Sequence, residues 1–180
     1  MCRPVDGGRT AKRHQANRLS GTSFWVAIVV LLIQGTALAQ RGGGAPITLT
    51  FESVSGGLPV SGAGTDTASV NFGNVSAFKP VGAGVTRSST ATDYTISTPF
   101  GVKVTKTGGT SPNYTLQARL MASHALTWRI NSVAMSTTYA TVGSTLPYAS
   151  TISHTLEFVV PLTYAAGAVT TQFQVLAISN

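Results

Sequence analysis

The last thirty residues of this 180-residue chain contain two segments in which apolar side chains alternate with polar ones, and this pattern constrains the fold most. In the first segment the alternate side chains are Ile152, His154, Leu156, Phe158 and Val160. In the second they are Thr171, Phe173, Val175 and Ala177. A period of two is typical of a β-strand with one buried face. The sequence therefore predicts two strands. We expect Pro161 at the end of the first strand and a hairpin turn at Ala165-Ala166-Gly167.

The sequence upstream predicts further short strands. Ile47, Leu49 and Phe51 alternate with polar residues as a first strand. A second strand is expected at Ser69 to Gly73, where Phe72-Gly73 suggests a buried ring beside a bend or bulge. The stretch from Val85 to Phe100 predicts one or two short strands, with Tyr94 and Ile96 on one face.

A second hairpin is expected near the middle of the chain. Phe100, Val102 and Val104 alternate with polar residues, and Tyr114, Leu116, Ala118 and Leu120 do so after the turn Thr107-Gly108-Gly109-Thr110. His124 to Ile130 predicts another strand, with Leu126, Trp128 and Ile130 facing one way. Asn131 to Ser150 is expected to be irregular, with a short strand in its middle.

The composition favours strands over helices. Residues 41–180 contain 23 threonines and 16 serines but very few lysines and glutamates. Seven to nine short strands at about ten-residue intervals indicate an all-β fold. We predict a two-layer antiparallel β-sandwich with immunoglobulin-like topology, formed by residues 47–180 as one domain.

The first 39 residues have the features of a secretory signal peptide. A basic segment precedes the apolar run Phe24 to Ile33, and Ala37-Leu38-Ala39 forms a small-x-small cleavage site. The alternative is a membrane anchor, but ten apolar residues are fewer than the roughly 20 that span a bilayer. We therefore predict export to the periplasm, cell surface or extracellular space, with no stable membrane span after cleavage. Residues 40–46 form a predicted glycine-rich flexible arm.

The distribution of charge argues against nucleic-acid binding. The formal net charge is +7, but residues 1–40 hold five of the twelve basic residues and only one of the five acidic ones. Residues 41–180 contain seven basic and four acidic side chains, scattered singly. No basic stripe is present that could neutralise a row of phosphates. The only cysteine, Cys2, lies in the predicted leader, so the mature protein is expected to contain no disulfide.

Two parts of the chain resemble a known family. Phe72-Gly73-Asn74-Val75, together with Ala166-Gly167 and the closing segment Thr171 to Asn180, is similar to secreted bacterial pilin-type domains, including the spore coat protein U group. The resemblance implies an immunoglobulin-like subunit of a surface fibre or extracellular coat. It further implies that an N-terminal strand can complete the sheet of a neighbouring subunit.

Catalytic and metal-binding patterns are weak. Asp66-Thr67-Ala68-Ser69 resembles the aspartate turn of aspartic proteases, but a single copy would require a homodimer, and a loop aspartate in an Asx-type turn is favoured. His124 and His154 lack a second ligand at metal-binding spacing, and Glu157 is expected on the opposite face from His154. We predict no enzymatic activity and no catalytic, cofactor-binding or metal-binding residues.

The aromatic residues suggest a different function. Tyr139, Tyr148, Trp128 and Tyr164 could stack on sugars if they are exposed, and a neutral, hydroxyl-rich surface suits polysaccharide contact. The principal hypothesis is an exported structural or adhesive surface protein that pairs with copies of itself or with other surface subunits. The alternative is an extracellular carbohydrate-binding or cell-wall-binding module. A homodimeric aspartic protease using Asp66 is the remote alternative.

Overall fold

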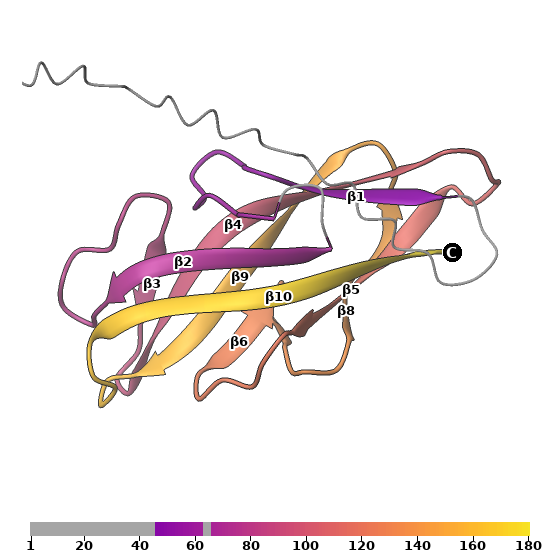
Figure 1. The fold of residues 1–180 in the computed structure, drawn as a ribbon. Coiled ribbons are helices and arrows are strands. Elements are labelled where there is room, and N and C mark those ends of the chain that lie inside the picture. The colour runs from indigo at the N-terminus through magenta and orange to yellow at the C-terminus, as the bar shows by residue number, and fades with distance from the viewer. Residues whose placement is uncertain (1–45, 63–65) are drawn as a thin grey trace, which may run out of the picture. The chain divides into compact units, whose positions relative to one another are not determined.

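The structure is a computed structural model that describes residues 46–62 and 66–180. The described residues form ten β-strands in two antiparallel sheets that pack face to face (Figure 1). The predicted two-layer antiparallel sandwich is therefore confirmed. The predicted signal peptide and residues 40–45 of the predicted arm lie outside the described residues.

One sheet has six strands and the other has four. The six-stranded sheet has the order β1-β4-β9-β6-β7, and β3 also pairs with β4. Its strands are β1 (Ile47–Glu52), β3 (Thr86–Ser89), β4 (Asp93–Lys106), β6 (Thr127–Ile130), β7 (Val133–Ala134) and β9 (Thr151–Pro161). The four-stranded sheet has the order β2-β10-β5-β8. Its strands are β2 (Thr67–Val75), β5 (Asn113–Leu120), β8 (Ala140–Pro147) and β10 (Gly167–Ser179).

The predicted strand faces are confirmed. In β1, β9 and β10 the side chains predicted to share a face point inward, and nearly all of them are buried. Pro161 ends β9, where its missing N–H costs no ladder hydrogen bond. Phe72 is buried, and Gly73 has a φ of +65° beside a shift in register between β2 and β10. The expected bulge after a buried ring is therefore present.

Both predicted hairpins are wrong. The strands β4 and β5 lie in opposite sheets, as do β9 and β10 (Figure 1). The connections 107–112 and 162–166 cross from one layer to the other instead of reversing within one sheet. Gly167, expected in the second turn, is the first residue of β10 and pairs with Val75. The reason is that β4 already has β1 and β3 along one edge and β9 along the other, so β5 finds no free edge there.

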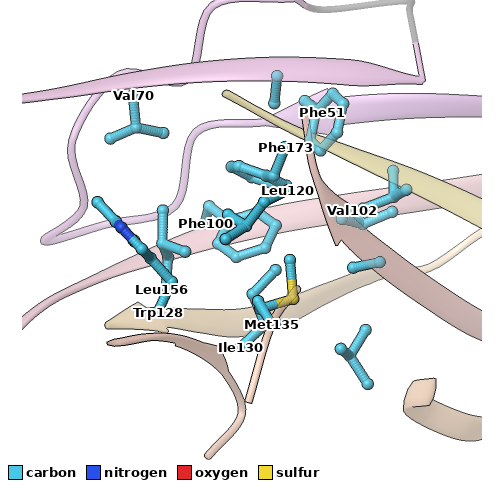
Figure 2. Close-up of a cluster of buried hydrophobic side chains, with 14 of the residues drawn as sticks. Phe51, Val70, Phe100, Val102, Leu120, Trp128, Ile130, Met135, Leu156 and Phe173 are labelled. Atoms are coloured by element: carbon cyan, nitrogen blue, oxygen red, sulfur yellow. The ribbon is translucent and has the colours of Figure 1, made fainter. Parts of the chain in front are cut away.

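The core fills the space between the two sheets. Phe51 and Phe100 come from the six-stranded sheet and meet Phe173 of the four-stranded sheet at centroid distances of 5.9 and 5.3 Å (Figure 2). Trp128 packs against Phe158 at 4.5 Å, and Phe72 contacts both rings from the other sheet. These aromatic contacts join the layers, so the sandwich does not depend on a disulfide.

A loop covers the part of β4 that lies between β3 and β1. The Leu58 N–H donates to the Thr98 hydroxyl at 2.8 Å, and this hydroxyl donates to the Gly84 carbonyl at 2.8 Å. Thr98 is fully buried, so the two hydrogen bonds satisfy a hydroxyl that has no access to water. Gly57 lies directly over Pro99, and a side chain at Gly57 would overlap with the Pro99 carbonyl oxygen.

We expect Gly57→Ala to lower the free energy of unfolding by about 1–3 kcal/mol, because the added methyl group must displace the loop from β4. Gly82→Ala is the matched control, since a Cβ at Gly82 meets no other atom within 4 Å. It should change stability by less than about 0.5 kcal/mol. Chemical denaturation of both variants measures the difference. Equal stabilities would show that the 55–62 loop is not held against Pro99.

Candidate functional site

The free edge of β1 is the first candidate surface. The Thr107 N–H donates to the Pro46 carbonyl, so the even-numbered residues of β1 direct their backbone groups toward β4. The backbone groups of Ile47, Leu49 and Phe51 therefore point away from β4, and no other described strand pairs with them. Such an edge is a template for pairing with another chain.

The other sheet edges among the described residues are less regular. At the opposite end of the six-stranded sheet, β7 has only two residues, and β3 has four. In the four-stranded sheet, β2 carries the bulge at Gly73, while β8 has register shifts and ends at Pro147. Short strands, bulges and prolines hinder edge-to-edge pairing. The six-residue strand β1 has a continuous register with β4 and lacks these features between its first and last residues.

The outer face of the four-stranded sheet is the second candidate surface. A row of side chains crosses three strands there: Arg119 donates to the Gln174 amide oxygen at 2.9 and 2.6 Å, and the Gln174 amide nitrogen donates to Asp66 at 2.5 Å. The Arg119 guanidinium also lies 4.8 Å from the centroid of the Tyr139 ring. The positive and negative groups of this row are therefore paired through one glutamine.

Hydrogen bonds within the domain hold Asp66 in place. Its second carboxylate oxygen accepts from the Thr67 hydroxyl at 3.2 Å, and its carbonyl accepts from the Val175 N–H at 2.8 Å. Among the described residues, the other carboxylates bond elsewhere: Glu52 to Thr151 and Lys103, Asp93 to Thr90 and Thr92, and Glu157 to Arg129. Asp66 thus has no carboxylate within the described residues with which to share a proton.

His154 lies in the core beside Asn131. The Asn131 amide oxygen accepts from the Thr155 N–H, so its amide nitrogen must donate, to the Val142 carbonyl at 3.0 Å and to His154 Nδ1 at 2.8 Å. His154 therefore carries its proton on Nε2, an atom with no hydrogen-bond partner in the described part of the chain. Burial lowers the pKa of His154 to about 4, so the ring is neutral near pH 7. The prediction that Glu157 points to the opposite face is confirmed by the alternating burial of β9.

His124 lies in an exposed loop between β5 and β6. Its ring packs edge-on against Trp128 at 5.5 Å, and Nε2 lies 3.5 Å from the Thr171 hydroxyl. No group of three His, Cys, Asp or Glu residues in the described ranges is placed to hold a metal ion. The two histidines are in different environments, one buried between the sheets and the other at the surface.

The aromatic residues proposed for sugar contact separate into two pairs. Tyr139 and Tyr164 are partly exposed, at 37% and 42%. Trp128 is buried in the core, and Tyr148 packs against Tyr114 with Lys106 over its ring. The prediction that all four could face a ligand is therefore wrong for Trp128 and Tyr148. Their positions depend on packing between layers, which the sequence pattern does not report.

Phe78 is an exposed aromatic residue that the sequence analysis did not select. It is 88% exposed in the loop between β2 and β3. Arg87 shapes this loop by donating to the carbonyls of Ser76 and Lys79 at 2.7 and 2.6 Å. The alternation of β-strands carries no information about a loop residue, so no sequence signal could have distinguished Phe78 from a core phenylalanine.

The comparisons with known proteins identify no relative. No family model, curated protein or solved structure matches this chain. Within the part of the chain that the structure describes, no helix has the length and apolar character needed to cross a bilayer.

Proposed function

We propose that this protein is an exported structural or adhesive surface subunit whose copies pair through sheet edges. The observation that carries the proposal is the free edge of β1, a regular six-residue strand with unpaired backbone groups at Ile47, Leu49 and Phe51. Main-chain hydrogen bonds along such an edge supply affinity between chains without requiring a specific pocket. The weak resemblance to pilin-type and spore coat protein U domains agrees with this function.

The burial of β1 bears on the proposed mode of pairing. The inner-face side chains Ile47, Leu49 and Phe51 are almost completely buried against the chain's own core. A subunit that lost β1 would expose this apolar surface, so deletion of Arg41 to Phe51 should unfold the domain and would not test assembly. We therefore favour addition of a neighbouring strand to the free edge of an intact domain.

Thr48→Lys tests edge pairing while leaving the buried face of β1 unchanged. Lysine on an edge strand places a charge where a neighbouring strand would dock, so we expect self-association to weaken several-fold. Thr105→Lys is the matched control because Thr105 lies directly opposite Thr48, on the same face but one strand inward. Sedimentation velocity of the exported protein over a concentration series measures association.

A wild-type protein that stays monomeric at every concentration would contradict the proposal, as would equal association of the two lysine variants.

N-terminal sequencing of the same exported sample tests the predicted signal peptide. We expect the mature chain to begin at Gln40, whereas an intact Met1 would contradict cleavage after Ala39.

A further inference from the structure

A groove lies on the outer face of the four-stranded sheet, apart from the edge of β1. Its volume is about 400 Å³, within the range of small-molecule sites. We call it the β2–β10 groove; its lining residues are Ser69, Asn71, Met121, Ala122, His124, Thr170, Thr171 and Gln172. They come from β2, from β10 and from the loop that follows β5.

The lining contains hydrogen-bonding groups that have no partner among the residues that the structure describes. The side chains of Ser69, Thr170 and Gln172 form no hydrogen bond within the described residues. The Asn71 amide oxygen accepts from the Gly73 N–H at 2.8 Å, which leaves the Asn71 amide nitrogen free to donate. Hydroxyls and amides both donate and accept, so the groove offers both kinds of group at close spacing.

Among the described residues, no aspartate, glutamate, lysine or arginine lines the groove. The charged groups Arg119 and Asp66 are paired through Gln174. A phosphate, a carboxylate or an ammonium group would therefore find no counter-charge here. An uncharged ligand with many hydroxyl groups matches the free donors and acceptors.

His124 also lines a second hollow of about 220 Å³, whose apolar lining residues are Leu120, Leu126 and Met135. The His124 ring packs against the Trp128 ring at a centroid distance of 5.5 Å. The half-exposed Met121 and the imidazole offer apolar surface against which the C–H face of a sugar ring can pack.

We propose that the β2–β10 groove binds a neutral polysaccharide chain. Gln172 and Asn71 supply hydrogen bonds to sugar hydroxyls, and Met121 packs against a ring. This site differs from the four aromatic residues considered from the sequence, of which Trp128 is buried and Tyr148 is partly buried. It is independent of edge pairing through β1.

The test is an NMR titration of the exported, ¹⁵N-labelled protein with cellohexaose, chitohexaose and maltohexaose, with a heparin hexasaccharide as the anionic comparison. We expect at least one neutral hexasaccharide to shift the amide signals of residues 121–124 and 170–172 saturably. Gln172→Ala and His124→Ala should each weaken that binding at least tenfold. Gln117→Ala removes the same side chain from the same sheet face outside the groove and should change binding less than twofold.

The proposal would be overturned if no neutral hexasaccharide shifted the signals of the groove residues. It would also be overturned if both groove variants bound with wild-type affinity, or if the heparin hexasaccharide bound more tightly than every neutral one. Thr48→Lys separates this site from the proposed assembly function. It should leave saccharide binding intact, and Gln172→Ala should leave self-association intact.

Discussion

Phe173→Ala should prevent accumulation of folded protein, or lower the free energy of unfolding by about 3–5 kcal/mol where folding persists. Phe173 is fully buried in β10 and contacts Phe51 and Phe100 of the opposite sheet (Figure 2). Truncation leaves a cavity between the layers, where neighbouring rings cannot close the gap. Because a domain of this size is stable by only about 5–15 kcal/mol, the loss is a large fraction of the total.

Gln172→Ala is the control for this prediction because Gln172 is the exposed neighbour of Phe173 on the same strand. Its side chain makes no hydrogen bond within the described residues, so we expect a change below about 0.5 kcal/mol. Thermal and urea unfolding of both variants give the comparison. A melting temperature for Phe173→Ala equal to that of the wild type would contradict the inward orientation of this face of β10.

Stability should fall as the pH is lowered from about 6.5 to about 4 because of His154. Burial lowers the pKa of His154 to about 4 in the folded state, whereas an unfolded histidine has a pKa near 6.5. Below pH 6.5 the unfolded chain binds a proton that the folded chain does not, so protons favour unfolding. By about pH 4 the folded protein has lost about 3 kcal/mol of the stability that it has above about pH 7.

The hydrogen-bond geometry around His154 also predicts that the folded state loses stability as the pH falls. Asn131 presents an N–H to His154 Nδ1, so a proton on Nδ1 would place two donors against each other. His154→Gln provides the control, since a glutamine oxygen can accept from Asn131 without titrating in this range. Urea unfolding from pH 7 to pH 4 should show a steeper loss in the wild type than in the variant. Parallel pH profiles would contradict the role assigned to His154.

The candidate surfaces were only partly predictable. The first strand at Ile47, Leu49 and Phe51 was expected from its alternation, and its place at the edge of a sheet follows from its pairing with β4 alone. The β2–β10 groove could not be expected, because Asn71, His124 and Gln172 are far apart in the sequence and meet only through sheet pairing and one loop. The hydrogen bond between Asp66 and Gln174 could not be expected either, because the two residues lie 108 positions apart in the sequence.

The sequence by itself determined the buried side of the strands that alternate clearly, but it wrongly extended the strand at Trp128 back to His124, which lies in a loop. Period-two alternation is a local property, set by the burial of one face, and it correctly placed Phe158 in β9 and Phe173 in β10 inside the core. Only the tertiary structure decided how the strands pair. A connection of five or six residues permits either a hairpin within one sheet or a crossing between sheets, and both arrangements bury the same alternating side chains. The crossing occurs because β4 and β9 have their edges occupied by other strands, an outcome of long-range pairing that no local pattern records.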